Sequence, residues 1–161
     1  MTNRLFTENQ CKDIIKKAEE LDNWSHNISN NFSYNIVTFN SDKYISDIIT
    51  DYCSKYLKLN VLNINMGVIK YKVNDYMGRH YDRNSGTDFN KDFLYNINVR
   101  LNDEFSGGEF YLKDKIFESK VGDVYHYKST EWHEVKPITN GVRYIALFYI
   151  RERDIGTNKI I

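Results

Sequence analysis

The sequence predicts a mainly β protein, an antiparallel barrel or double-sheet jelly roll with two helices on one face. Apolar residues recur with helical spacing in two segments of the first sixty residues, and after Leu59 the period changes to two. About eight short segments of this second kind follow, with turn-forming residues between them. Two helices followed by many short strands indicate an antiparallel sheet that is covered by helices.

The first helix is expected to begin at Thr7. Thr7 and Gln10 have the spacing of a capping box, in which each side chain accepts a hydrogen bond from a backbone N–H of the first turn. The apolar residues that follow share one helical face: Cys11, Ile14, Ile15, Ala18 and Leu21. A second helix is expected from a longer apolar stripe: Tyr44, Ile45, Ile48, Ile49, Tyr52, Cys53, Tyr56 and Leu57. The polar residues between the helices predict a loop with one short strand at 34–39.

The expected strands after Leu59 are 64–73, 79–82, 93–101, 109–112, 116–119, 121–127, 133–138 and 142–151. Strand 93–101 is the most informative, because it alternates. Its odd-numbered residues are apolar, and Asn96, Asn98 and Arg100 share the other face with Leu94. In an open sheet the polar face would meet water. In a jelly roll with helices outside, that face lines an interior cavity suited to binding.

The composition favours one globular domain over residues 1–161, with helical support in 1–60 and the β core in 61–151. Lys+Arg and Asp+Glu number 22 each, so the formal net charge is zero, and neither a nucleic acid nor a membrane is expected as partner. The N-terminus lacks the apolar core of a signal peptide, which predicts a cytoplasmic protein. Cys11 and Cys53 are expected to be reduced and buried. The oligomeric state stays open.

Arg143 stands in an otherwise apolar run, where a cation is costly to bury unless an anion meets it. Either a carboxylate distant in sequence or a bound anion must pair with it. If Asn140-Gly141 formed a flat hairpin, His133 would lie roughly 17 Å along the ladder from Arg143. If the chain instead steps between sheets at this corner, the two side chains can reach opposite ends of one dicarboxylate.

His80 and Asp82 form an HxD pair whose side chains would point to the same side of a strand. By itself this pair is more often a surface feature than a site. His133 adds a second imidazole from another strand. Two histidines and one carboxylate leave coordination positions open, which suits non-haem Fe(II) and O2 chemistry. A structural zinc site would have four protein ligands, usually including cysteine, and neither cysteine is nearby in sequence.

Four motifs in order carry a family resemblance: the HxD pair, SGGEFYL at 106–112, GDVYHY at 122–127 and HEVKPITNGVRY at 133–144. Over residues 66–150 the chain resembles the Fe(II)- and 2-oxoglutarate-dependent dioxygenases, and most closely their prolyl 4-hydroxylase-like branch. The resemblance implies a double-stranded β-helix, with His80, Asp82 and His133 as the catalytic iron ligands. It implies that Arg143 binds the distal carboxylate of 2-oxoglutarate through a charge-assisted contact.

Further residues are expected at the site. Tyr71 matches a cosubstrate-contacting tyrosine, although a core tyrosine is nearly as good a reading. Arg100 stands where many relatives have tyrosine, so it either helps to hold the anion or points outward. Tyr149, Asn98 and Arg83 are expected in the substrate pocket. The loop 83–92 is expected to act as a mobile lid, with an ordinary surface loop as the alternative.

The function expected is hydroxylation coupled to oxidative decarboxylation of 2-oxoglutarate, with Fe(II), 2-oxoglutarate and O2, and with ascorbate as a reductant. The favoured substrate is a prolyl residue in a peptide or protein. A free amino acid or another small molecule is the alternative, and a non-catalytic metal-binding jelly roll is a third. Asp82 disfavours the halogenating relatives, which lack that carboxylate. Tyr149 replaces the second arginine of the nucleic-acid demethylases, so we expect no nucleic-acid substrate.

Overall fold

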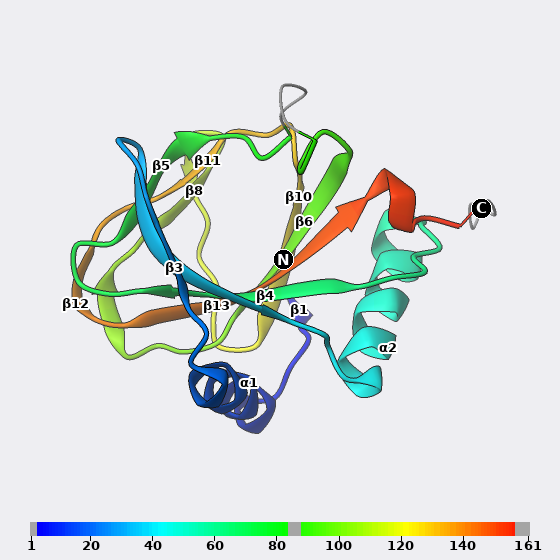
Figure 1. The fold of residues 1–161 in the computed structure, drawn as a ribbon, viewed down its shortest axis with the longest axis horizontal. Helices are drawn as coiled ribbons and strands as arrows, with labels where there is room; N and C mark the ends of the chain where they lie inside the picture. Colours follow the sequence, from blue (N-terminus) through cyan, green and yellow to red (C-terminus); the bar gives the residue numbers. More distant parts are fainter. Residues whose placement is uncertain (1–2, 84–87, 157–161) are drawn as a thin grey trace.

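The computed structural model describes residues 3–83 and 88–156, and most of them form one strongly curled antiparallel sheet. Two helices cover one face of this sheet, and its strands curl away from them around an interior (Figure 1). The predicted fold class, a jelly roll with two helices outside one sheet, is confirmed. Among the described residues, no helix is long and apolar enough to cross a membrane.

The two helices have the predicted positions. Helix α1 (Glu8–Leu21) is capped by Thr7, which accepts from the Gln10 backbone N–H while the Gln10 side chain accepts from the Thr7 N–H, as predicted. Helix α2 (Lys43–Tyr52) is capped by Asp42, which accepts from the Ile45 N–H at 2.8 Å. It continues as the π-helical turn η1 (Cys53–Leu57). Cys11 and Cys53 are buried and free, as expected.

The strands form one large sheet and one small sheet. In the large sheet the order is β1-β10-β6-β13-β4-β3-β5-β11-β8-β9, with β2 paired to β3, and the small sheet is β12-β7. Their bounds are β1 Asn3–Arg4, β2 Ser25–Ile28, β3 Phe32–Phe39, β4 Asn65–Tyr71, β5 Tyr76–His80, β6 Phe93–Arg100, β7 Phe105–Gly107, β8 Phe110–Leu112, β9 Lys115–Ile116, β10 Asp123–Lys128, β11 His133–Val135, β12 Ile138–Gly141 and β13 Arg143–Arg151. A 3-10 turn, η2 (Glu152–Asp154), follows β13.

Several expected boundaries were wrong. β5 begins before the expected strand and ends at His80, so Asp82 lies in the following loop rather than on the strand. The expected strand 133–138 is two strands, because Pro137 lacks the N–H that a continuous ladder needs. β2 and β7 were not expected, because β2 is polar apart from the exposed Ile28 and β7 runs through the turn-like Ser106-Gly107.

The corner at Asn140-Gly141 does carry the chain from one sheet to the other. Residues up to Gly141 pair with β7 in the small sheet, and Arg143 begins the pairing with β4 in the large sheet, opposite Tyr71. Gly141 has a φ of +75°, and a Cβ there would collide with the Glu104 carbonyl oxygen. The step predicted for a shared His133–Arg143 ligand is therefore present, and the flat hairpin is not.

Two apolar clusters lie on opposite sides of strand β6, because its successive side chains point to opposite faces of the sheet. Ile97 and Val99 belong to the larger core, which includes Ile14 of α1 and Ile49 of α2. A second cluster lies on the opposite side of the sheet and contains Ile69, Tyr71, Phe110, Tyr125, Tyr127, Val135, Ile138 and Leu147. The polar face of β6 looks toward this second side, as predicted, and the candidate site lies there.

Candidate active site

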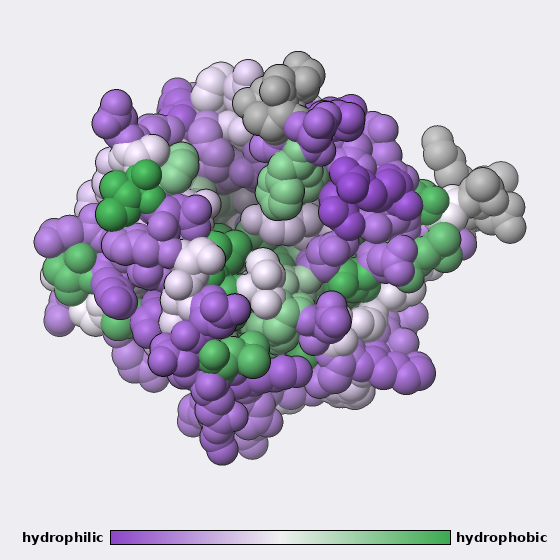
Figure 2. All heavy atoms as spheres, in the orientation of Figure 1, coloured by the Kyte–Doolittle hydropathy of each residue, from purple (hydrophilic) through white to green (hydrophobic). Residues whose placement is uncertain are grey.

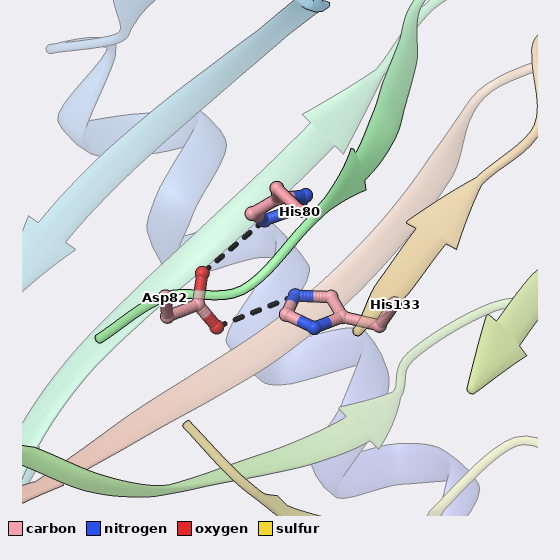
Figure 3. A group of neighbouring side chains, drawn as sticks. All are labelled: His80, Asp82 and His133. Carbon is pink, nitrogen blue, oxygen red and sulfur yellow. Dashed lines mark ion pairs between the residues drawn. The ribbon is translucent and has the colours of Figure 1, made fainter. Parts of the chain in front are cut away.

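His80, Asp82 and His133 converge on one point (Figure 3). His80 ends β5 and His133 begins β11, and these two residues are direct partners in the antiparallel ladder. Asp82 lies two residues beyond β5, with Oδ1 3.2 Å from His80 Nε2 and Oδ2 3.3 Å from His133 Nε2. The two imidazole rings are 4.3 Å apart between centroids. One potential ligand atom from each side chain lies within 4.8 Å of the others.

Backbone carbonyls orient both imidazoles. His80 Nδ1 lies 2.7 Å from the Gly78 carbonyl oxygen, and His133 Nδ1 lies 3.0 Å from that of Glu131. A carbonyl only accepts, so each Nδ1 carries a proton and each Nε2 can present a lone pair to the shared point. This outer support is typical of metal-ligating histidines. Two such nitrogens and one carboxylate are the donor set of a non-haem Fe(II) centre, so the residues present fit the metal.

The charges of the three residues support one another. Burial alone would raise the pKa of Asp82, but hydrogen bonds from His133 and His80 outweigh it and hold that pKa well below its usual range. Burial alone would lower the pKa of His80, but the hydrogen bond and charge of Asp82 outweigh it and raise that pKa. A divalent cation at the shared point would act as the positive partner of the Asp82 carboxylate.

The carboxylate of Asp82 has a further partner that the sequence did not reveal. Asn96 on β6 donates from Nδ2 to Asp82 Oδ2. The loop carrying Asp82 is held by two more contacts: Asp82 N–H donates to the Ser129 carbonyl at 3.0 Å, and Asn90 Nδ2 donates to the Asp82 carbonyl at 2.6 Å. The sole sequence signal for Asn96 was its place on the inward face of β6.

A cavity of about 220 Å³ adjoins the triad. The face shown in Figure 2 is largely hydrophilic, and hydrophobic side chains appear in its middle as well as separately toward its edges. The cavity is built by β3, β4, β5, β6, β8, β10, β11 and β13 and by the residues after β5, so nearly every strand of the curl contributes. Its lining residues are Phe32, Tyr34, Ile69, Tyr71, Met77, His80, Tyr81, Asp82, Asn90, Asn98, Phe110, Tyr125, Tyr127, His133, Val135, Arg143, Ile145, Leu147 and Tyr149.

Arg143 lines this cavity and is buried, with 5% of its surface exposed. Its guanidinium carbon lies 5.2 Å from the centre of the Tyr71 ring, its partner across β13 and β4. Within residues 3–83 and 88–156, no carboxylate forms an ion pair with Arg143. Tyr125 lies near it, and although burial raises the pKa of Tyr125, the charge of Arg143 opposes that rise. A buried cation without an internal anion is a site for an anionic ligand.

The remaining expected residues divide into two groups. Tyr71, Asn98 and Tyr149 line the cavity. Arg100 does not: it forms an ion pair with Asp103 at 2.9 Å and donates to the carbonyls of Ser119 and Asn102. Arg83 also does not line the cavity: it pairs with Glu152 at 3.0 Å.

The expected lid, 83–92, is only partly described, since residues 84–87 lie outside the described ranges. Both of its ends contact the turn η2. Arg83 pairs with Glu152, and Asp92 accepts from Arg153 at 2.7 Å.

Several cavity residues were missed by sequence reasoning. Tyr125 and Tyr127 point inward from β10, and the Tyr127 ring centroid lies 4.6 Å from that of His133. Tyr127 accepts from Asn98 at 3.1 Å. The YHY alternation could have indicated them, because tyrosines two apart share a face. His126 between them lies within hydrogen-bonding distance of the Tyr52 hydroxyl, 2.7 Å away, outside the cavity.

An aromatic pair stands at the rim of the cavity. Tyr81 follows His80 and Trp132 precedes His133, so the register that joins the histidines also joins these two rings. Their centroids are 4.7 Å apart in an edge-to-face arrangement. About half of each side chain is exposed, which leaves aromatic surface open beside the triad.

The sequence pattern of the 2OG-Fe(II) oxygenase superfamily matches residues 66–151. The chain belongs to that superfamily. It is 25% identical over 167 aligned positions to a PKHD-type hydroxylase of Aliarcobacter butzleri, with 88% of this chain and 72% of that protein covered. It is 41% identical over 51 residues to a PKHD-type hydroxylase of Pseudomonas putida, a match covering 29% of this chain and 23% of that one.

Solved structures share this oxygenase fold. A Pseudomonas putida prolyl-4-hydroxylase superimposes with a TM-score of 0.76 at 14% identity, covering 94% of this chain and 91% of that one. A viral collagen prolyl hydroxylase of Paramecium bursaria Chlorella virus-1, in complex with 2OG, has a TM-score of 0.73 at 20% identity, with 92% and 93% covered. Family and fold together make this protein a 2-oxoglutarate-dependent dioxygenase of the prolyl hydroxylase-like kind, and the family implies Fe(II), 2-oxoglutarate and O2.

Proposed function

We propose that this oxygenase hydroxylates a prolyl residue in a peptide or protein, with iron held by His80, Asp82 and His133. One observation carries the proposal: three ligand atoms and one buried arginine, which has no carboxylate partner in the described part of the chain, open into the same cavity. A metal at the triad and an anion at Arg143 would be the two ends of a single binding site. A dicarboxylic keto acid such as 2-oxoglutarate has the groups to occupy both ends.

The bound iron and 2-oxoglutarate would supply the oxygen activation: O2 gives one atom to succinate and one to a substrate C–H bond, and CO2 leaves. The chain's own residues have other tasks. The triad fixes the coordination geometry, with the backbone carbonyls of Gly78 and Glu131 holding the imidazoles. Arg143 orients the cosubstrate, and the aromatic lining keeps water from the reacting atoms. Ascorbate is proposed as the reductant that keeps the iron divalent.

The charges of the cavity favour a peptidyl substrate over a free amino acid. Among the described lining residues, the charged groups are the triad and Arg143, and all four are committed to metal and cosubstrate. Residues 84–87 read NSGT and add no charge. A free amino acid would bring an ammonium and a carboxylate into this site without partners, which is costly. A prolyl residue inside a peptide brings neither charge.

The rim and one solved structure support the same choice. Tyr81 and Trp132 offer exposed aromatic surface on which the residues flanking a target proline can pack. The Trichoplax adhaerens prolyl hydroxylase was solved in complex with a peptide fragment of the hypoxia inducible factor oxygen degradation domain. It matches this fold with a TM-score of 0.73 at 18% identity. We propose that the corresponding face receives peptide here.

The test is product analysis with purified protein, Fe(II), 2-oxoglutarate and O2. We expect succinate release together with a mass gain of one oxygen atom on a proline-containing peptide, and no gain on free L-proline. Asp82→Ala should abolish both products, whereas Asp47→Ala, the same change on the exposed surface of α2, should not. Oxidation of free proline but not of peptides would overturn the peptidyl assignment. Absence of succinate with every substrate would overturn the triad.

A further inference from the structure

We infer that Asn96 is a positioning residue of the metal centre, which holds the carboxylate of Asp82 so that a single oxygen binds the metal. Asn96 is 1% exposed and lies in the middle of β6, with backbone partners Tyr127 on one side and Tyr149 on the other. A residue between two paired strands has little freedom to shift. Its side chain therefore approaches Asp82 from a rigid element.

The need for such a residue follows from where Asp82 lies. The two histidines sit on paired strands, but Asp82 sits in the loop after β5. The contacts from Ser129 and Asn90 hold its backbone and leave its side chain free to rotate. Apart from the two histidines, the described partner of its carboxylate is Asn96. Nothing else in the described chain fixes which oxygen faces the metal.

The hydrogen bond from Asn96 favours metal binding through one oxygen of the Asp82 carboxylate, because it engages the other oxygen. Nδ2 occupies one acceptor position of Oδ2, which leaves Oδ1 as the oxygen free to bind a cation. A carboxylate that bound through both oxygens would fill a coordination position needed by cosubstrate or O2. An amide is neutral, so it fixes the carboxylate without cancelling the charge that attracts the metal. A lysine or arginine in its place would compete with the cation.

The other half of the amide shows that packing alone does not explain this residue. Asn96 Oδ1 is buried and has no hydrogen-bond partner among the described residues. A buried acceptor without a partner destabilises a fold, and an apolar side chain of similar size would avoid that cost. Turning the amide over would place Oδ1 against the Asp82 carboxylate, which is repulsive. The amide therefore leaves one buried acceptor unsatisfied, while its donor side lies against Asp82 and also contacts the Tyr127 hydroxyl.

The experiment separates positioning from packing by measuring metal affinity without turnover. Co(II) serves as a stable substitute for Fe(II) and is titrated calorimetrically into the metal-free protein. Asn96→Leu has similar volume and removes both amide groups. We expect it to weaken Co(II) binding about 10- to 100-fold, the usual cost of losing an outer partner of a metal ligand. The metal-free variant should melt at the same temperature as wild type or higher.

Asn98→Ala is the matched control, because Asn98 lies on the same face of β6 but contacts Tyr127 rather than a metal ligand. Asn96→Ala should behave as Asn96→Leu does for Co(II), and it serves if the leucine variant does not fold. The d–d absorption of bound Co(II) should also change with either Asn96 variant, because it reports coordination number. The control should match wild type in both measurements.

This inference rests on the proposed role of the triad, and the two can fail separately. If wild type binds no Co(II), the triad assignment fails. If wild type and both Asn96 variants bind Co(II) within threefold of one another, Asn96 does not position Asp82. If Asn98→Ala loses as much affinity as Asn96→Ala, the effect belongs to β6 packing and the inference is overturned.

Discussion

Replacing Arg143 should weaken 2-oxoglutarate binding strongly while leaving the metal-free protein as stable as before, or more so. Arg143 is buried, and across residues 3–83 and 88–156 it has no carboxylate partner. Breaking a buried, hydrogen-bonded charge pair costs about 2–5 kcal/mol. At about 1.4 kcal/mol per tenfold, Arg143→Leu should raise the Kd for 2-oxoglutarate from roughly 30-fold to several thousand-fold.

The stability change should have the opposite sign. In the absence of the dicarboxylate, Arg143 is a desolvated cation without an internal counter-charge, so an apolar side chain there removes an unfavourable group. The assay is anaerobic titration of the Fe(II) protein with 2-oxoglutarate, paired with thermal unfolding of the metal-free protein. Arg143→Lys should recover only part of the affinity, because an ammonium lacks the bidentate geometry of guanidinium.

Arg100→Leu is the control for this prediction. Its guanidinium already contacts Asp103, Ser119 and Asn102, so its loss should cost stability and change the Kd for 2-oxoglutarate by less than about threefold. The reasoning is refuted if Arg143→Leu binds 2-oxoglutarate as wild type does. It is also refuted if the metal-free variant unfolds far more easily, since that would mean Arg143 serves the fold. A large affinity loss in Arg100→Leu would place both arginines on the anion.

Three further predictions concern pH, the rim and a close contact. The raised pKa of His80 makes its contribution to stability fade as pH rises through that pKa, whereas burial lowers the pKa of His126 and acts in the opposite direction, so the comparison is made against His80→Gln. The melting-temperature advantage of metal-free wild type over His80→Gln should be larger at about pH 5.5 than at about pH 8, and the depressed pKa of Asp82 makes its contribution fade only in stronger acid. Co(II) should stabilise wild type more at about pH 8, since it needs neutral imidazole. Trp132→Ala should raise the KM for a peptide roughly 5- to 30-fold without altering that for 2-oxoglutarate. Gly78→Ala should lower the free energy of unfolding by about 1–3 kcal/mol in urea titrations, because the new Cβ would lie 2.7 Å from the Asn31 carbonyl oxygen.

Each of these has a contrary result. If the advantage of wild type over His80→Gln is the same at both pH values, the His80–Asp82 pairing contributes nothing to the pH dependence of folding. A rise in peptide KM of the same size in Tyr44→Ala, which removes an exposed aromatic from α2, would show a nonspecific effect rather than a rim contact. Wild-type stability in Gly78→Ala would mean that the turn at Asn31 moves freely.

The sequence predicted those parts of the site that depend on residue type and local spacing. The HxD pair and a second imidazole suited an iron site, and the family resemblance implied His80, Asp82 and His133 as its ligands. Arg143 was expected to need a bound anion or a distant carboxylate, because it is a cation in an apolar strand, and the resemblance implied the bound anion. The corner before it was expected to change sheets because a flat hairpin would separate Arg143 from His133. The structure has this step.

The sequence could not predict contacts that depend on where distant segments meet. Arg100 was left between two interpretations, because its pairing with Asp103 depends on the shape of the turn after β6. Asn96 was recognisable only as one inward-facing polar residue of an alternating strand. Its contact with Asp82 depends on the path of the loop after β5, which the sequence pattern does not predict. Tyr125 and Tyr127 could not be distinguished from ordinary strand residues in the sequence, because their position at the cavity depends on the pairing of β10 with β6.

The alternation of β6 has a practical consequence for redesign. Ile97 and Val99 pack toward the helices, whereas Asn96 and Asn98 face the triad and the cavity. Because successive residues lie on opposite sides, a library that varies position 98 reshapes the cavity without repacking the helical layer. Substitutions at 97 and 99 are expected to change the stability of the fold, because these residues pack on the helices, and to leave substrate selectivity unchanged, because they do not line the cavity. One strand of eight residues thus offers two independent controls to an engineer.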